Sequence, residues 1–400
     1  MDILIIAHYM DVPNSKGNSR FSYLANQIVD YTEKNKVEVV TSSFSHRLKK
    51  QKEIGEMELK ETKYNLTICY EPGYTKNVCL KRLHSHNIFG KNLEKYLEER
   101  QEPDLIYCAV PSLDAAYAAW KYAQKRKVKF MIDIQDLWPE AFEMVFHVPL
   151  ISRLIFTPMK RKADKIYSNA DEIIAVSDTY AQRAKSVNHK VRDTYTVFLG
   201  RELKKFDLAV KRYRKAFDFD TVRLAYCGTL GHSYDLRCVV DALEILKKRK
   251  VDNVELVIMG DGPLRQEFEQ YAASKGIRAV FTGYLEYEKM CGLLASCDIA
   301  VNPISHRAAQ SIINKHADYA AAGIPVVSTQ ENEEYKNLVE IYHMGFNCIN
   351  GDAGDLAEKI EMLVNDVELR KKMGKNARRC AQERFDREKS YKELVKKIIC

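Results

Sequence analysis

The chain contains 400 residues, of which 46% are hydrophobic and 30% are charged, and its formal net charge is +8. This length predicts two or three domains, and the hydrophobic content is sufficient for packed cores, which excludes a disordered chain. The modest positive charge favours anionic small molecules or an anionic membrane surface as partners, and it argues against a nucleic-acid-binding protein.

The spacing of cysteine and histidine gives no metal-binding pattern. The ten cysteines include no C-x-x-C pair, and Cys69, Cys108 and Cys227 lie in apolar, strand-like stretches. We interpret them as reduced core residues of a cytosolic protein. His84 and His86 are expected in a polar loop rather than in a metal site.

Strands and helices alternate along the first half of the chain. The start, MDILIIAHYM, has an acid at position 2 and a short apolar run, so it is expected to be a first strand and not a signal peptide. A polar loop with Gly17 and Asn18 follows, and then a helix. The further expected elements are strands 37–40 and 66–70, helix 87–100, strand 103–110, helix 115–124, strands 129–134 and 171–177, helix 178–185 and strand 196–199. This alternation predicts a doubly wound α/β sheet.

Polar side chains follow the strand that ends near residue 134, in the sequence DIQDLWPE. Open α/β sheets bind ligands at the carboxyl ends of their strands. Asp136 is therefore a catalytic candidate, with Gln135 beside it. The alternative for Asp136 is a capping residue before the next helix.

The pattern restarts in the second half, after a polar and charged segment at 201–220 that is expected to be a linker. The expected elements are strand 222–227, helix 235–248, strand 256–259, a helix to about 275, strand 280–282, helix 287–296, strand 299–303, and helices 355–364, 368–383 and 387–398. Four of these strands end in glycine, proline or Asn-Pro elements. Such loops line one edge of a second sheet, so two similar halves facing each other across a cleft are predicted.

The stretch QSIINKHADYAAAGIPVVST, residues 310–329, combines a short helix with a following strand. The helix is expected to begin at Asn314 and Lys315 and to end at Gly323, which suits the left-handed position after a helix. Lys315 and Asp318 are three residues apart and share a helix face, while the alanines keep the helix thin. An acid and a cation near a helix N-terminus can bind a sugar hydroxyl pair and a phosphate together. The alternative is an ordinary surface helix.

Five segments of the second half occur in a fixed order: YCGTLGHSYDL (226–236), VIMGDGP (257–263), FTGYLEYEKM (281–290), CDIAVNPI (297–304) and NKHADYAAAGIPVVS (314–328). Together they resemble the nucleotide-sugar half of glycosyltransferase family 4. In the first half, DIQDLWPEAF, DEIIAVSDTY and VFLGRELKKFD resemble the bacterial polysaccharide-biosynthesis branch of the same family.

The resemblance implies the GT-B fold, an α/β architecture with two Rossmann-like domains. Residues 1–200 would form the acceptor-binding domain, with helix 386–400 packing back on it, and residues 201–385 the nucleotide-sugar-binding domain. The implied reaction is transfer of a hexosyl or acetamidohexosyl group from a UDP- or GDP-sugar, with retention at the anomeric carbon and without a required metal or other cofactor. The implied acceptor is a lipid-linked saccharide of capsule, exopolysaccharide or O-antigen synthesis.

The resemblance also assigns site residues by position. Backbone N–H groups of Gly228, Thr229 and Gly231 would meet the diphosphate, and Asp318 would bind the ribose hydroxyls. The expected catalytic residues are Asp136, Lys315 and Gln135, and the expected donor-binding residues are Gly17, Asn18, Gly228, Thr229, Gly231, His232, Gly260, Gly262, Tyr284, Leu285, Asn314 and Asp318. The chain around Tyr284 and Leu285 would meet the base.

The chain departs from the family pattern at three places. Gln310 stands where the family often has the first of two acids, and Gln135 stands where it often has a histidine. The usual arginine and lysine phosphate clamp after the first glycine loop is replaced by the sequence His-Ser-Tyr, residues 232–234. We expect Lys315 to supply the missing cation, with His232 as the next candidate. The alternative for Lys315 is a solvated lysine at a helix start.

Two other functions compete with a glycosyltransferase. Gln310 and Gln135 keep open a non-catalytic sugar-nucleotide-binding partner or regulatory subunit of the same pathway. A sugar-nucleotide epimerase is less favoured, since more acids and histidines would be expected across the cleft.

The segment LISRLIFTPMKRKADK, residues 150–165, carries apolar residues alongside cations that include Arg153, Lys160, Arg161 and Lys162. This composition is typical of a helix that lies on a membrane surface and predicts peripheral attachment to the inner face of the cytoplasmic membrane. Pro158 is expected to break or kink a single long helix. The alternative is a core helix with a solvated basic end.

Overall fold

The computed structural model describes residues 1–10, 19–32, 34–53, 62–77, 79–143, 149–217, 220–306, 308 and 311–399, without the side chains at 143 and 149–154. Gly17, Asn18 and Gln310 therefore lie outside the described residues. The chain divides into two compact units. The N-terminal unit consists of Met1–Phe198 and Tyr391–Cys400, and the C-terminal unit of Leu199–Ser390.

The N-terminal unit is built on a parallel sheet in the order β5-β2-β1-β6-β7-β8-β9. Its strands are β1 (Asp2–Ile6), β2 (Lys36–Ser42), β5 (Asn65–Cys69), β6 (Leu105–Val110), β7 (Lys129–Ile134), β8 (Glu172–Ala175) and β9 (Tyr195–Thr196). A small antiparallel pair, β3 (Phe44–Ser45) and β4 (Lys50–Gln51), follows β2. The central strands are apolar on both faces, as in a sheet covered on both sides.

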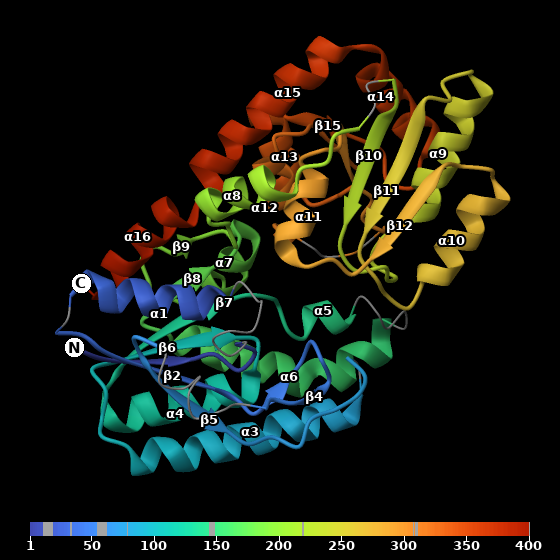
Figure 1. Ribbon diagram of the computed structural model, residues 1–400. Helices are drawn as coiled ribbons and strands as arrows, with labels where there is room; N and C mark the ends of the chain where they lie inside the picture. Colours follow the sequence, from blue (N-terminus) through green and yellow to red (C-terminus); the bar gives the residue numbers. More distant parts are fainter. Residues whose placement is uncertain are drawn as a thin grey trace. The chain divides into compact units, whose positions relative to one another are not determined.

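Helices cover both faces of this sheet (Figure 1). The helices are α1 (Arg20–Tyr31), α3 (Leu80–Glu99), α4 (Leu113–Arg126), α5 (Glu140–Glu143), α6 (Pro149–Asn169), α7 (Asp178–Lys185) and, from Tyr391 on, α16 (Arg387–Ile399). Ile28 of α1 and Leu394 of α16 share one core with Val39 and Tyr107 of the sheet. On the other face, α3 packs against α4 and α4 against α6.

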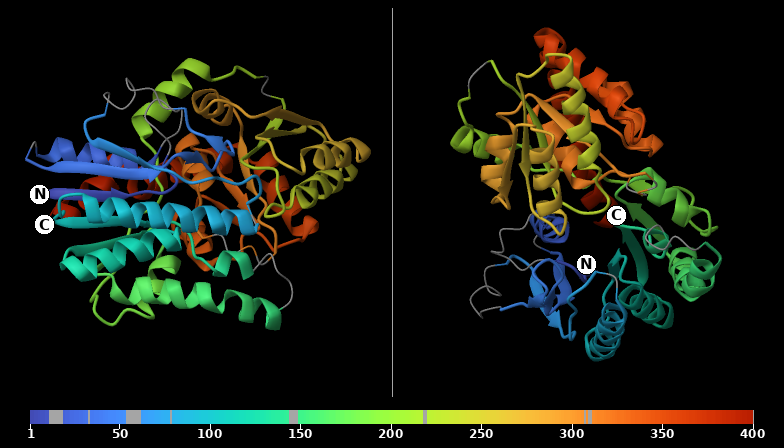
Figure 2. Two further views of the ribbon diagram at one scale, coloured as in Figure 1. Left: turned by 90° about the horizontal axis from the view of Figure 1, so that it is seen from below. Right: turned by 90° about the vertical axis from the view of Figure 1, so that its right-hand side faces the viewer.

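The C-terminal unit repeats this plan with a parallel sheet in the order β12-β11-β10-β13-β14-β15. The strands are β10 (Val222–Cys227), β11 (Val254–Met259), β12 (Ala279–Gly283), β13 (Ile299–Asn302), β14 (Val326–Ser328) and β15 (Gly345–Asn347). The helices are α8 (Leu203–Tyr213), α9 (Leu236–Lys248), α10 (Arg265–Ser274), α11 (Tyr287–Leu294), α12 (Asn314–Ala322), α13 (Glu333–Tyr342), α14 (Ala353–Asn365), α15 (Val367–Cys380) and the π-helix η1 (Ala381–Phe385). Residues of α9, α10 and α14 form one core with the sheet, and Figure 2 shows the helices beside the strands from two further directions.

Three expectations about local structure are wrong. The segment at 201–220 is not a linker throughout, because α8 occupies Leu203–Tyr213. Leu203, Phe206 and Ala209 are buried at helical spacing within this charged segment, and α8 packs against α11. His86 is not in a loop but on α3, where it is 1% exposed.

The third correction concerns α6, which continues from Pro149 to Asn169 with Pro158 inside it. A proline removes one backbone donor from a helix, but α6 tolerates this loss and remains one element. Among the described residues, no helix is both long enough and apolar enough to cross a membrane.

Candidate functional site

The position of α12 is fixed by one buried tyrosine. The hydroxyl of Tyr319 accepts a hydrogen bond from the Cys227 N–H and donates one to the Val301 carbonyl, both at 3.1 Å. These bonds tie the helix to the carboxyl-terminal parts of β10 and β13. The helix ends at Gly323, whose φ of 69° is the left-handed conformation that glycine adopts readily. The first turn of α12 is thereby held at the ligand-binding edge of the sheet.

Two glycine loops meet at the same edge. Gly228 follows β10 with φ 137°, and Gly260 follows β11 with φ 155°. A β-carbon on Gly260 would lie 1.8 Å from the Gly228 carbonyl oxygen, so only glycine permits this approach. The Gly228 N–H, expected to meet the diphosphate, donates to the Met259 carbonyl at 3.0 Å. Among the described residues, the N–H groups of Thr229 and Gly231 donate to no backbone carbonyl.

A cavity of about 540 Å³ lies between these loops and α12. Its size is typical of a small-molecule site. Eight of the residues expected at the site line it: Gly228, Thr229, Gly260, Tyr284, Leu285, Asn314, Lys315 and Asp318. Gly231, His232 and Gly262 are not among the lining residues, and the side chain of His232 is exposed.

Lys315 is buried in the wall of this cavity and is not a solvated lysine, since its exposed fraction is 6%. Its ammonium lies 3.6 Å from the centroid of the Tyr234 ring and 4.1 Å from that of Tyr226. Among the described residues its Nζ has no hydrogen-bond partner. Burial lowers the pKa of Lys315 to about 7, because no carboxylate offsets the loss of water. The cavity therefore contains a cation that lacks an anion.

Asp318, by contrast, is already held by protein groups. Arg201 donates to both of its oxygens, from Nε at 2.6 Å and from Nη2 at 2.8 Å. The Tyr287 hydroxyl donates to Oδ1 at 3.0 Å. A carboxylate offers about four acceptor positions, so about one is left for a ligand hydroxyl. Arg201 lies in VFLGRELKKFD and Tyr287 in FTGYLEYEKM, two segments that carry the family resemblance, but the sequence analysis assigned neither residue to the site.

Asp136 and Gln135 lie in the N-terminal unit, just after β7. The Leu137 N–H donates to Asp136 Oδ1 at 2.9 Å. Burial raises the pKa of Asp136, and its hydrogen bonds oppose that rise. The Gln135 amide donates to Asp133 at 2.7 Å, and Asp133 is in turn paired with Arg20. Gln135 thus belongs to a buried polar network.

A second polar network at this edge was not expected from the sequence. His8, which follows β1, contacts Glu71 through Nε2 at 2.8 Å and Ser112 through Nδ1 at 2.6 Å. His86 contacts the Tyr9 hydroxyl at 2.8 Å. Ligand atoms of the two histidines and of Glu71 lie within 4.8 Å of one another. Glu71 also accepts from two serine hydroxyls, so these buried groups satisfy one another as a hydrogen-bond network.

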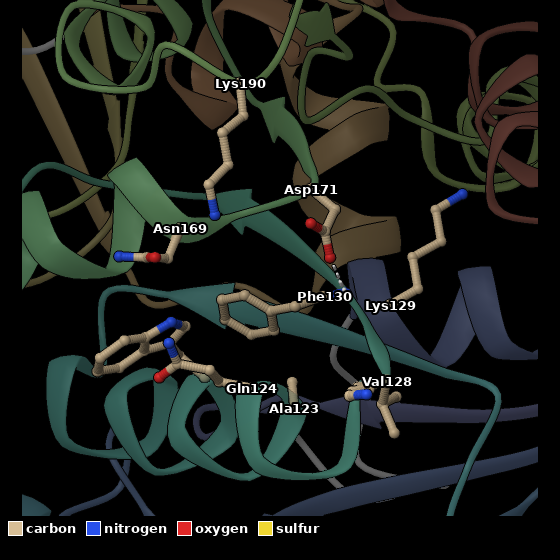
Figure 3. Close-up of a pocket in the computed structure, with 10 residues that line it drawn as sticks. Ala123, Gln124, Val128, Lys129, Phe130, Asn169, Asp171 and Lys190 are labelled. Atoms are coloured by element: carbon tan, nitrogen blue, oxygen red, sulfur yellow. Dashed lines mark hydrogen bonds between the residues drawn. The ribbon is translucent and has the colours of Figure 1, made fainter.

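A second cavity, of about 360 Å³, lies in the N-terminal unit near the start of β7 (Figure 3). Lys129, Lys190 and Asp171 are among the residues around it, and Asp171 accepts a hydrogen bond from the Phe130 N–H at 2.9 Å. Because Lys129 begins β7, this cavity lies at the amino end of that strand. Open α/β sheets bind ligands at the opposite edge, so the cavity is not part of the candidate site.

Comparison with known proteins finds similarity to sugar-transferring enzymes. Residues 211–380 match the family model of glycosyl transferases group 1. A GDP-mannose-dependent alpha-(1-6)-phosphatidylinositol dimannoside mannosyltransferase of Mycobacterium tuberculosis is 30% identical over 199 residues, 48% of this chain and 48% of the relative. A GalNAc-alpha-(1->4)-GalNAc-alpha-(1->3)-diNAcBac-PP-undecaprenol alpha-1,4-N-acetyl-D-galactosaminyltransferase of Campylobacter jejuni is 29% identical over 161 residues, 39% of this chain and 42% of the relative.

The solved structure of the Anabaena protein HepE in complex with UDP-glucose resembles the whole chain. Its TM-score is 0.67 at 16% identity, and the match covers 100% of this chain and 99% of that chain. At this identity the likeness shows the fold, which is the GT-B fold with two Rossmann-like units. By sequence, the chain spans about half the length of the curated relatives it matches.

Proposed function

We propose that the protein is a retaining glycosyltransferase that moves a sugar from a nucleoside-diphosphate sugar to a saccharide acceptor. The observation that carries this proposal is the unpartnered ammonium of Lys315 in a cavity bounded by two glycine loops. A buried cation without a counter-charge is unfavourable on its own and favourable beside an anion. The diphosphate of the donor supplies that anion.

The other lining residues complete a donor site in this proposal. The Thr229 N–H and the N-terminus of α12 lie at the cavity and would donate to the same anion, because helix starts and backbone donors favour phosphate, and the Gly231 N–H is proposed as a further donor from outside the lining. Asp318 accepts one ribose hydroxyl through its remaining acceptor position. Tyr284, which is 67% exposed, and Leu285 cover the base.

The proposed chemistry follows from where charge grows. As the bond between sugar and diphosphate breaks, the leaving oxygen becomes more negative, and a preorganised cation stabilises that change more than it stabilises the bound donor. Lys315 supplies this charge, so the proposal includes no required metal. Asp136, with a raised pKa, is proposed as the group that exchanges a proton at the acceptor.

Donor and acceptor classes are proposed from the relatives. The names of the relatives and of the solved structure include GDP-mannose and UDP-glucose, so a UDP- or GDP-sugar that donates a hexose or acetamido sugar is proposed. One relative acts on phosphatidylinositol dimannoside and another on a saccharide carried by PP-undecaprenol. A lipid-linked saccharide of capsule, exopolysaccharide or O-antigen synthesis is the proposed acceptor.

A thermal-shift panel of UDP-, GDP- and ADP-sugars tests the donor site. At about 100 times its dissociation constant, the correct donor stabilises the protein by about 2.7 kcal/mol. Lys315→Met, at the same donor concentration, should lose about half of this stabilisation or more. Lys372→Met, which changes an exposed lysine of the same unit, should keep it. A wild-type protein that none of the nucleotide sugars stabilises would show that the cavity is not a donor site.

A non-catalytic sugar-nucleotide-binding partner remains the second candidate, because the Gln135 amide is bound to Asp133 and cannot act as a base. The two functions differ in turnover. A transferase should slowly release nucleoside diphosphate from its donor without any acceptor, whereas a binding partner should bind the donor and leave it intact.

The proposal includes reversible attachment to an anionic membrane surface, at the inner face of the cytoplasmic membrane, through α6. Ile155 on this helix is 63% exposed. Lys160 and Lys162 each pair with a carboxylate, of Asp164 at 3.0 Å and of Asp114 at 2.5 Å. These pairs reduce the charge that α6 can offer to anionic lipids.

A further inference from the structure

Arg82 lies in the first turn of α3, near residues that follow the strands β1, β5 and β7. Its exposed fraction is 8%. The carbon of the guanidinium lies 4.5 Å from the ring centroid of Trp138, 5.5 Å from that of Tyr74 and 5.9 Å from that of Tyr9. The side chain is therefore enclosed by aromatic rings at the edge of the sheet where ligands bind.

The guanidinium uses only part of its hydrogen-bonding capacity. Nη1 donates to the Asn77 carbonyl at 2.7 Å, and Nη2 donates to the Tyr9 hydroxyl at 3.0 Å. Nε has no partner among the described residues. An arginine carries five N–H donors, and among the described residues the contacts with Asn77, Tyr9 and Tyr74 leave some of them, Nε included, without an acceptor.

No carboxylate within the described part of the chain forms an ion pair with Arg82. The acid in the same cluster is Glu71, whose oxygens accept from His8 at 2.8 Å, Ser42 at 2.5 Å and Ser85 at 2.6 Å. Glu71 is thus neutralised within its own network. Among the described residues, the contacts of the guanidinium are with ring faces and neutral oxygens, and Asp136 is a carboxylate near enough to interact with it without forming an ion pair.

Other groups add positive potential at the same place. The Lys49 ammonium lies 4.9 Å from the Tyr74 ring centroid and donates to Asn77 Oδ1 at 2.5 Å. The first turn of α3 contains no acidic residue, and no side chain caps its N-terminus. Burial, followed by the charge of Arg82, lowers the pKa of Lys49 to about 8 and that of His46 to about 3. A helix start, a buried guanidinium and a lysine thus lie together, and none of the described carboxylates forms an ion pair with either cation.

We propose that Arg82, Lys49 and the N-terminus of α3 form a second anion site, which binds the phosphate or diphosphate group of a phosphorylated acceptor. That the ligand is the acceptor rests on the proposed glycosyltransferase function, whereas the anion site itself does not. The chemistry matches a phosphate, because a phosphate accepts several charge-assisted hydrogen bonds at once from arginine, lysine and backbone donors. Tyr9, whose side chain is partly exposed, would lie beside the phosphate and the group that carries it.

Trp138 makes this site directly observable. The chain has two tryptophans, Trp120 and Trp138, so Trp120→Phe leaves one indole, 4.5 Å from the Arg82 guanidinium. The full-length Trp120→Phe protein is titrated with inorganic pyrophosphate, glucose 1-phosphate and farnesyl diphosphate, with farnesol as the uncharged control. A saturable change in Trp138 fluorescence is expected with farnesyl diphosphate and not with farnesol. A response to all three phosphates assigns recognition to the phosphate alone, and a response to farnesyl diphosphate only assigns it to a lipid-borne phosphate.

Matched variants in the same background identify the cation. Arg82→Gln should weaken the fluorescence-detected binding at least tenfold, and Arg82→Lys should weaken it less while keeping the charge. Lys81→Gln removes one charge from the same turn at an exposed position and should bind as the parent does. The proposal is overturned if no phosphate changes Trp138 fluorescence, or if Arg82→Gln and Lys81→Gln have equal effects on binding. Donor binding is measured separately by thermal shift. Failure of either the donor site or the Arg82 site can therefore be detected without the other.

Discussion

In the N-terminal unit, Arg20 and Arg82 are both buried at the same edge of the sheet, but among the described residues only Arg20 forms an ion pair with a carboxylate. Arg20 donates to Asp133 from Nε at 2.7 Å and from Nη2 at 3.2 Å, and it also donates to the Val197 carbonyl and the Tyr391 hydroxyl. Arg82 has aromatic rings and neutral oxygens around it instead.

The C-terminal unit repeats this contrast. Arg201 forms a two-point ion pair with Asp318, whereas Lys315 lies one helix turn away from Asp318 with no partner among the described residues. A buried charge that is paired within its folded unit is compensated there, whereas an unpaired one can be compensated by the anion of a ligand. Removing a paired cation should therefore damage folding, and removing an unpaired one should damage ligand binding.

The largest expected effect is the loss of stability when the ion pair between Arg20 and Asp133 is broken. Arg20→Met leaves the fully buried Asp133 carboxylate without its partner, which should lower the free energy of unfolding by about 3–5 kcal/mol. Urea unfolding followed by circular dichroism measures this change. Lys63→Met, which breaks an exposed pair with Asp30, should change stability by less than about 1 kcal/mol. Equal effects of the two substitutions would mean that burial does not separate these pairs.

Substitution of Asp318 tests the same contrast between paired and unpaired cations by removing the carboxylate that pairs with Arg201. Asp318→Ala leaves Arg201 buried without its carboxylate, so it should cost about 3 kcal/mol of unfolding free energy and also weaken donor binding sharply. Asp318→Glu keeps a carboxylate and should be partly tolerated in both respects. Urea unfolding and calorimetric titration with the donor nucleotide measure the two quantities. Unchanged nucleotide affinity in a folded Asp318→Ala protein would exclude a ribose contact.

The pH dependence of stability tests Lys315. Its pKa in the folded chain is about 7, below the usual 10.5, so between these values the unfolded chain binds one more proton than the folded chain. The free energy of unfolding of the wild type, relative to Lys315→Met, should therefore rise with pH by about 1.4 kcal/mol per unit. Between pH 7 and pH 9 this amounts to about 2–3 kcal/mol in paired urea titrations. A difference that stays flat over this interval would mean that the ammonium is compensated in the folded protein.

How much of this contrast could be predicted from the sequence depends on the distance along the chain. The α/β fold and the helix from Asn314 to the Gly323 stop follow from local patterns and were predicted correctly. The pairing of Arg201 with Asp318 joins residues 117 positions apart, and nothing near either residue indicates it. The roles assigned to the individual site residues stay predictions.

Local patterns also failed where tertiary packing decides. The three buried residues of α8 are outnumbered by charged neighbours, so the composition of 201–220 indicated a linker, and contact with α11 makes it a helix. Pro158 suggested a break that α6 does not have. The surroundings of Arg82 could not be predicted, because its aromatic neighbours come from loops after three different strands.

Loss of the unpaired Lys315 should weaken nucleotide binding, whereas loss of a paired cation should mainly damage folding. Lys315→Met should weaken binding of the donor nucleotide by about 10- to 100-fold, since a charge-assisted hydrogen bond contributes about 1.5–3 kcal/mol. The bound diphosphate should also return the amine to its charged form. Calorimetry at pH 8.5 in buffers of different ionisation enthalpy should therefore show proton uptake with the wild type and none with Lys315→Met. Turnover within about twofold of wild type would place the cation of the donor site elsewhere.

The smallest expected effect is on membrane attachment through α6. Two of its cations form ion pairs, as Arg20 and Arg201 do, and so differ from Lys315 and Arg82. Each cation near an anionic leaflet contributes about 1 kcal/mol, but Lys160 and Lys162 already pair with Asp164 and Asp114. Residues 160–162 should therefore attract the leaflet as about one cation, Arg161, does, together with the exposed Ile155, and this attraction should be screened at high salt.

Flotation with anionic liposomes measures this attachment. A minor fraction of the wild type should float at low salt and none at high salt, and changing Lys160, Arg161 and Lys162 together to Gln should remove that fraction. The matched control changes the exposed Lys371, Lys372 and Lys375 of α15 to Gln and should float as the wild type does. If the α6 variant floats as well as this control, or if the wild type never floats, α6 serves packing alone and its ion pairs are complete without a membrane.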